Sequence, residues 1–173
     1  MINKNLSFNK EKFKQVLHFM VHKAGAIDNV GKTVLYKMMY FSDFDFYELN
    51  NYPITGESYV KLPLGPAPTH FDRTVQELEK EGVIKEINAS YHGLTQKKVV
   101  SLCEPKADKL NGEEIKIIER VVARLSNMNA SQVSAYSHED IPWKATEEGE
   151  EIDYELVFYR NQKHAVSPPT LVC

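Results

Sequence analysis

Apolar residues in the first part of the chain recur with the 3.6-residue period of α-helices. Between residues 9 and 23 they are spaced three and four apart, from Phe13 to Val21, and Gly25 follows as a stop signal. Residues 31–49 are apolar nearly all the way round, which is typical of a helix buried on every side. The pattern therefore predicts an amphipathic helix followed by a central buried helix.

A proline-rich segment, residues 52–68, follows the predicted central helix. It contains four prolines and two glycines around one alternating run, residues 57–62, in which Tyr59 and Lys61 share one side. Proline fixes φ and removes a hydrogen-bond donor, whereas glycine permits conformations that other residues avoid. We expect one short strand here, inside a segment that is either a rigid corner or a surface that another molecule recognises.

After residue 68 the sequence pattern predicts shorter elements. A helix is predicted over residues 69–81, followed by strands at 83–87 and 97–102 that are joined by a polar connection, 88–96. This succession is the outline of a winged-helix tail, although many α+β folds share it.

Two further helices complete the predicted fold. One begins at Asn111, which forms a capping-box pattern with Glu114, and a shorter one ends near His138. Residues 154–159 are apolar and fit either a strand or a helix end. We expect a mainly α (α+β) fold: a compact bundle of five to six helices with a short strand and a small β-hairpin. A single domain is expected over residues 1–160, with a flexible tail at 161–173.

Composition and charge narrow the possible function classes. The chain has 173 residues with 21 Lys and Arg against 24 Asp and Glu, so its net charge is −3. That balance lacks the basic excess of a nucleic-acid-binding domain. No apolar run approaches the roughly 18 residues of a membrane span, and no signal-peptide pattern is present. We therefore expect a cytoplasmic protein that contacts neither a membrane nor nucleic acid.

Residues that could ligate metals or catalyse a reaction are scattered. His18 and His22 are four apart on a predicted helix and would share one face, but no third ligand matches them. Two cysteines are too few for a disulfide framework or a CxxC metal site. The chain has no phosphate-binding loop, GxSxG motif or HExxH motif. We expect no metal, no cofactor and no enzymatic activity.

Asp43 stands out because it is a carboxylate in the apolar central helix. A buried carboxylate must be paired or hydrogen-bonded. We therefore expect Asp43 to bond the backbone or a lysine near the proline-rich segment. In a catalytic alternative, Asp43, Tyr59 and His138 converge across the fold in one active site.

Four groups of residues occur in order along the chain: Tyr36-Lys37-Met38-Met39-Tyr40-Phe41-Ser42-Asp43, Pro53-Ile54-Thr55-Gly56, the segment from Tyr59 to Pro68, and Ser137-His138 followed by Pro142-Trp143. Through these groups the chain, over residues 10–160, resembles the Panacea antitoxin domain of the SocA-like family, also labelled phage-associated or GepA-like. The resemblance implies a mostly helical fold and a role in which the domain neutralises a toxin by direct contact.

The resemblance and the lack of active-site motifs together give a functional hypothesis. We expect a non-enzymatic antitoxin of a toxin–antitoxin system whose partner is a cognate toxin protein. A protease or chaperone is a further partner if the chain acts as a proteolytic adaptor. The alternative is a DNA-binding regulator that uses the winged-helix-like segment, where Lys97 and Lys98 supply the positive charge.

The hypothesis assigns residues to two roles. Trp143, the lone tryptophan, fits either a core position or an exposed anchor, and we assign it to the interface because tryptophan often carries binding energy. The predicted partner contacts are Tyr59, Lys61, Pro63, Gly65, Pro66, Pro68, His138 and Trp143. The predicted structural residues are Tyr40, Asp43, Pro53, Gly56 and Pro142.

Overall fold

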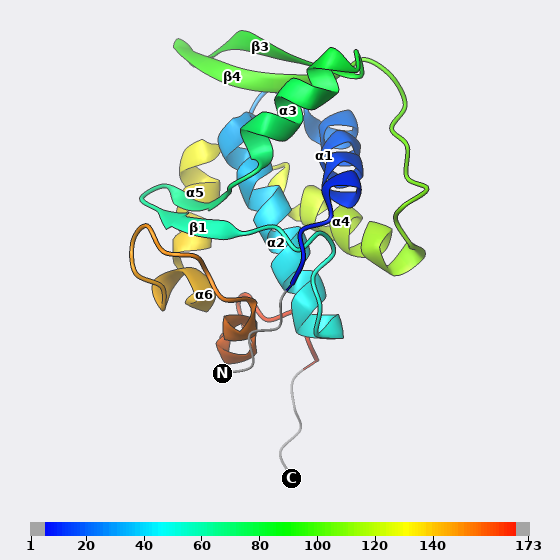
Figure 1. The fold of residues 1–173 in the computed structure, drawn as a ribbon. Helices are drawn as coiled ribbons and strands as arrows, with labels where there is room; N and C mark the ends of the chain where they lie inside the picture. The colour runs from blue at the N-terminus through cyan, green and yellow to red at the C-terminus, as the bar shows by residue number, and fades with distance from the viewer. Residues whose placement is uncertain (1–5, 169–173) are drawn as a thin grey trace.

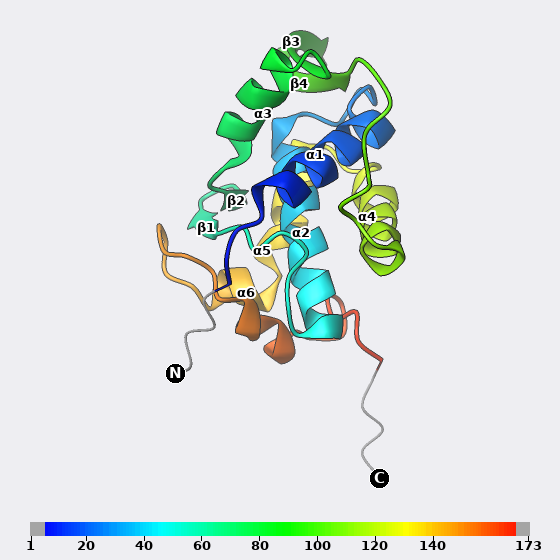
Figure 2. The same ribbon diagram turned by 45° about the vertical axis from the view of Figure 1, so that its right-hand side comes forward.

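One helix, α2 (Lys32–Asn50), runs through the centre of the molecule, and the other elements surround it (Figure 1). The computed structural model describes residues 6–168. Of the 19 residues in α2, 14 are buried, because helices α1, α4 and α5 and the strand β2 all pack against it. The predicted central buried helix is confirmed. The β1–β2 hairpin and α4 lie on opposite sides of α2 in both views (Figures 1 and 2).

The fold is α+β, as predicted, and the helix count is slightly higher than expected. Residues 6–168 contain seven helical segments, of which α6 and η1 are the shortest. Both are too short to produce a periodic pattern in the sequence. None of these helices is long and apolar enough to cross a membrane. Besides α2 they are α1 (Lys10–Ala24), α3 (Phe71–Lys80), α4 (Gly112–Leu125), α5 (Ala130–His138), α6 (Ile141–Lys144) and the 3₁₀ helix η1 (Tyr154–Tyr159).

Two antiparallel hairpins complete the described part of the chain. The first pairs β1 (Tyr59–Leu62) with β2 (Gly65–Pro68), and the second pairs β3 (Ile84–Tyr91) with β4 (Leu94–Ser101). The first hairpin corrects the prediction of a single strand in the proline-rich segment. The second lies with α3 at one end of the molecule (Figure 1).

The prolines of β2 are compatible with pairing because of their register. Lys61 is opposite Pro66 and Tyr59 is opposite Pro68. Lys61 directs its N–H away from β2, to the carbonyl of Glu150 (3.0 Å). Because the N–H groups alternate in direction along a strand, the Tyr59 N–H also points away from β2. Pro66 and Pro68 therefore lie at positions where the ladder needs no N–H from β2. The sequence predicts only one strand in this segment, because the positions of the prolines cannot be matched to a partner strand before the register is known.

The second hairpin is longer than predicted. The polar connection expected at residues 88–96 is wrong, since most of it belongs to β3 and β4. The strands are joined by His92 and Gly93, both at positive φ (48° and 77°). Two positive φ values in a row are the geometry of the tight turn that suits a twisted hairpin.

The chain after η1 returns to the C-terminal end of α2. Glu48 accepts hydrogen bonds from the N–H groups of Val166 (2.9 Å) and Ser167 (2.5 Å), and His164 is buried. Of the tail expected at 161–173, the part up to residue 168 therefore contacts the core. Residues 169–173 lie outside the described residues.

Candidate partner-binding surface

Asp43 holds the corner between α2 and β1. Its carboxylate accepts hydrogen bonds from the Thr55 N–H (2.8 Å), the Thr55 hydroxyl (2.6 Å) and the Tyr59 hydroxyl (2.6 Å). Burial raises the pKa of Asp43 to about 6, and these three hydrogen bonds counter the rise. At Gly56, where φ is +74°, a Cβ would lie 2.5 Å from the carbonyl oxygen of Ser7. The corner therefore depends on a carboxylate and on a residue without a side chain.

Tyr59 enters the core instead of facing solvent. Its side chain is 0% exposed, and its ring lies 5.7 Å from those of Tyr40 and Phe44, centroid to centroid. Lys61 lies on the same face of β1, but beyond the aromatic core. The structure corrects the expectation that Tyr59 contacts a partner: it anchors the hairpin to α2.

Strand β2 is the inner strand of the first hairpin, packed on α2 and α5. Gly65, Pro66 and Pro68 are buried in the free protein, so its surface does not offer them as the partner contacts that the sequence predicts. At Gly65, where φ is +117°, a Cβ would lie 2.5 Å from Ser137 Oγ and 2.6 Å from Lys37 Cε. The backbone approaches these two side chains so closely that only glycine fits.

Three of the predicted contact residues come together from three elements. The Lys61 ammonium lies 4.0 Å from the centroid of the Trp143 ring, and the His138 ring stacks on the same tryptophan at 4.3 Å. The Trp143 indole N–H donates to the carbonyl of Leu62 (3.3 Å). Trp143 is half-buried, so it is neither a core residue nor a free anchor. It braces the outer strand β1 against α5 and α6.

Two leucines at the turn between β1 and β2 are exposed. Leu62 is 43% exposed and Leu64 is 65% exposed, on either side of the exposed Pro63. In both ribbon views this hairpin lies at the outer margin of the molecule (Figures 1 and 2). We call Lys61, Leu62, Pro63, Leu64 and Trp143 the hairpin-tip surface. The sequence alone does not single out these leucines, because exposed and buried leucines look alike in a sequence.

A buried ionic cluster around Arg160 joins α2 to the segments around α6 and η1. Arg160 donates to both carboxylate oxygens of Asp140 (2.9 and 2.8 Å) and to Asp45 (2.7 Å). The Tyr40 hydroxyl donates to Asp140 as well (2.8 Å). Pro142, two residues after Asp140 in the chain, is also buried. The cluster ties the start of α6 and the chain after η1 to α2. The sequence alone does not reveal the pairing of Arg160 with Asp140, because no local pattern marks a pair 20 residues apart.

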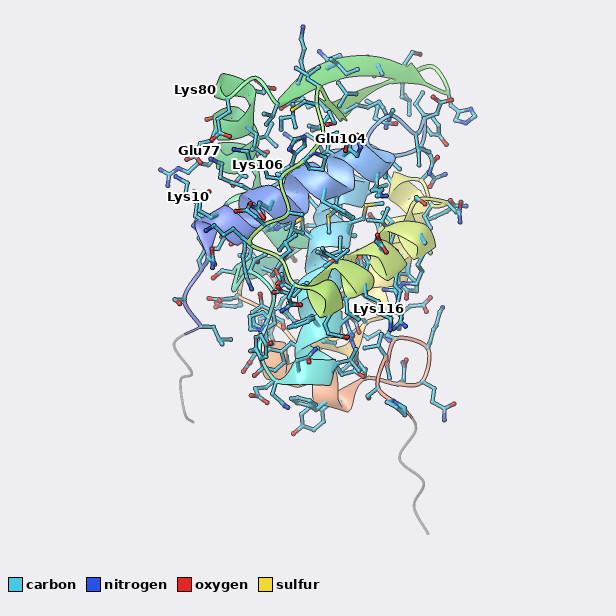
Figure 3. The ribbon with its side chains drawn as sticks, turned by 90° about the vertical axis from the view of Figure 1, so that its right-hand side faces the viewer. Lys10, Glu77, Lys80, Glu104, Lys106 and Lys116 are labelled. Carbon is cyan, nitrogen blue, oxygen red and sulfur yellow. The ribbon has the colours of Figure 1, made fainter. Side chains whose placement is uncertain are left out.

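The opposite face of the molecule carries charges of both signs. Lys10 forms an ion pair with Glu77 (2.9 Å), which joins α1 to α3. Such mixed charge does not give the single-sign surface that binds nucleic acid. Figure 3 shows cations and anions interspersed on this face, among them Lys10, Glu77, Lys80, Glu104, Lys106 and Lys116.

The two lysines of the winged-helix alternative differ in their exposure. Lys98 is buried, and its ammonium donates to the carbonyls of Ile27 (2.5 Å) and Val30 (2.7 Å). Lys98 therefore holds β4 against the loop after α1, and its charge does not face solvent. Of the pair, only Lys97 is placed to meet a phosphate group.

The residues of the catalytic alternative come together only in part. Asp43 and Tyr59 are hydrogen-bonded, but both are buried, and His138 stacks on Trp143. Within residues 6–168 no group of three His, Cys, Asp or Glu side chains could hold a metal ion. His18 lies 3.0 Å from Ser101 Oγ, and His22 lies 3.4 Å from Glu104.

A family model described as "Antitoxin SocA-like, Panacea domain" matches residues 35–144. The match covers more than half of the chain and includes the corner, the whole hairpin-tip surface and Asp140. Comparisons with curated proteins and with solved structures give no match.

Proposed function

The chain belongs to the family of SocA-like antitoxins with a Panacea domain, and from this membership we propose that it neutralises a toxin protein by binding to it directly. The binding face that we propose is the hairpin-tip surface. The exposure of Leu62 and Leu64 on a braced hairpin is the observation that carries this choice. In the same proposal the protein is not an enzyme, and its action is to cover or distort the toxin.

The hairpin-tip surface has the chemistry of a protein interface. Its centre is apolar, from Leu62, Pro63 and Leu64, and its margin has a lysine and a tryptophan indole. Interfaces commonly combine an apolar centre with aromatic residues and a polar rim. Full burial of an exposed leucine contributes about 1.5–3 kcal/mol, and Leu62 is already more than half buried. The exposed parts of the two leucines together correspond to about one full leucine, so they supply about 1.5–3 kcal/mol of binding free energy.

The base of the hairpin supports binding by limiting motion. Tyr59 and Asp43 hold one end of β1, and the Trp143 indole holds the carbonyl of Leu62 at the other. The backbone of Lys61 is bonded to residues 149 and 150 on its outer edge. A surface that is already ordered loses less conformational entropy when a partner binds.

A growth assay tests the proposal. The chain is co-expressed with each toxic product of the neighbouring genes, and we expect one of them to be neutralised. The double variant Leu62→Ser with Leu64→Ser is expected to lose the rescue. The matched control is Leu94→Ser, since Leu94 is 73% exposed at the turn of the other hairpin.

Two results contradict the proposal in different ways. If the wild-type chain rescues growth from none of the toxic neighbours, the antitoxin function fails. If it rescues growth but the double variant rescues equally well, the function stands and the hairpin-tip surface is wrong. Circular dichroism of both leucine variants shows whether each keeps the fold.

A further inference from the structure

Lys37 is a buried cation without a partner. It lies on α2 and is 2% exposed, and its ammonium has no hydrogen bond or ion pair within residues 6–168, although the nitrogen atom itself is not fully enclosed. Two other buried cations have partners: Arg160 bonds to Asp45 and Asp140, and Lys98 donates to the carbonyls of Ile27 and Val30. An unpaired charge in a protein interior is costly, so such groups are normally paired. Within residues 6–168, Lys37 therefore lacks both the counter-charge that Arg160 has and the backbone hydrogen bonds that Lys98 has.

The immediate surroundings of Lys37 are uncharged. A Cβ built on Gly65 would lie 3.1 Å from the Lys37 ammonium, and Ser137 Oγ lies beside the same glycine. The Tyr36 ring centroid is 5.9 Å from the ammonium. Burial alone lowers the pKa of Lys37 to about 8, with no neighbouring charge contributing. This pKa lies above 7, so most Lys37 side chains remain protonated at pH 7.

The site adjoins the hairpin-tip surface. Gly65 directly follows Leu64, so the backbone that covers Lys37 is continuous with the exposed tip. Lys61, on the other strand of the same hairpin, also has no carboxylate partner within residues 6–168 and instead lies over Trp143. A partner that docks on the tip is thus placed between one accessible ammonium group and one covered ammonium group.

We propose that Lys37 binds a carboxylate group that the toxin presents, from an Asp or Glu side chain or a chain terminus, when the toxin docks on the hairpin-tip surface. The inference rests on the proposed antitoxin function. The carboxylate approaches the ammonium beside Gly65, where a side chain would lie 3.1 Å from the Lys37 nitrogen and glycine leaves that space free. The new ion pair supplies the counter-charge that the free protein lacks.

The donors around Lys37 fit a carboxylate better than a phosphate. Pro66 and Pro68 have no N–H groups, so at these two positions β2 has no backbone donor that could bind an anion together with the Lys37 ammonium. The hydroxyl of Ser137 already donates to the carbonyl of Ser134 (2.8 Å). A single ammonium group suits a singly charged carboxylate, whereas a phosphate needs several donors.

The site is tested first on the protein alone, with acetate as the probe. The pKa of Lys37 is measured by NMR on lysine labelled with carbon-13, and its resonance is assigned by its absence in Lys37→Met. We expect acetate to raise this pKa by at least about one unit relative to chloride at the same ionic strength. Equal pKa values in the two salts overturn the site. A larger rise in phosphate than in acetate overturns the choice of carboxylate.

The second test uses a toxin that the wild-type chain neutralises. Lys37→Met is expected to bind it at least about tenfold more weakly, a loss of about 1.4 kcal/mol. The control is Lys97→Met, the same change on the other hairpin. Wild-type affinity in Lys37→Met overturns the contact with the toxin. If no toxin is neutralised at all, the proposed function fails, and the acetate result still decides whether Lys37 binds carboxylates.

Discussion

Replacing Lys37 by methionine is expected to stabilise the folded protein. The side chain is 2% exposed, and burial lowers its pKa from 10.5 to about 8. At about 1.4 kcal/mol per pKa unit, the charged group costs the folded state about 3 kcal/mol at pH 7. Methionine keeps most of the length of the lysine stem and removes the charge. We therefore expect Lys37→Met to raise the free energy of unfolding by about 2–3 kcal/mol.

The effect has a defined pH dependence. Between pH 8 and 10.5 the unfolded chain holds a proton on Lys37 that the folded protein has released. Where the unfolded state binds more protons, stability rises with pH, so the wild type gains stability across this window. Below pH 8 the full cost remains. At a pH of about 9.5 the cost is about 1.4 kcal/mol, so the difference between the two proteins is expected to fall by more than half.

Urea unfolding of both proteins, followed by circular dichroism at pH 7 and about pH 9.5, measures this difference. Subtracting one protein from the other removes the contribution of the buried tyrosines, which both contain. The reasoning is refuted if Lys37→Met is less stable than the wild type at pH 7. It is equally refuted if the difference between them is the same at both pH values.

Three further predictions concern the packing at Gly65, the buried ionic cluster of Arg160 and the corner at Asp43. Gly65→Ala is expected to lower the free energy of unfolding by about 2 kcal/mol or more, because φ is +117° and the added Cβ meets Ser137 and Lys37. Gly93→Ala is the control: φ is +77° there, but no atom lies within 4 Å of the added Cβ, so we expect a loss of about 1 kcal/mol. Thermal unfolding of the two variants compares these losses. Arg160→Met leaves Asp140 buried without a cation and is expected to cost about 3–5 kcal/mol by urea unfolding, and a neutral effect contradicts the role of the cluster. Asp43→Asn is expected to cost about 1–3 kcal/mol by the same assay, because an amide cannot accept all three hydrogen bonds of the corner; a stabilised variant contradicts this.

Much of the fold could be predicted from the sequence, because its strongest signals are local. The apolar surface of α2 on every side predicts burial in any context, and burial is what the structure shows. Strand β2 could not be predicted, because its acceptability depends on the register of Pro66 and Pro68 against β1. The turn at His92 and Gly93 was missed for a similar reason: the polar residues around it form a hairpin through pairing, without a buried face of their own.

The candidate site was predicted less well, for a physical reason. Alternation places Tyr59 and Lys61 on one side of a strand, but it does not say whether that side faces the core. Tyr59 faces inward, and its hydroxyl is held by Asp43. The exposure of Leu62 and Leu64 depends on the hairpin that carries them. Lys37 resembled an ordinary helix lysine until the packing of β2 above it was known.

The most direct test of the account is the affinity of the purified chain for the toxin that it neutralises, measured by isothermal titration calorimetry. For the double variant Leu62→Ser with Leu64→Ser we predict a dissociation constant at least about tenfold above that of the wild type. For Leu94→Ser, whose leucine is more exposed than either, we predict a value within about twofold of the wild type. Equal affinities for the double variant and the wild type contradict the claim that the hairpin-tip surface binds the toxin.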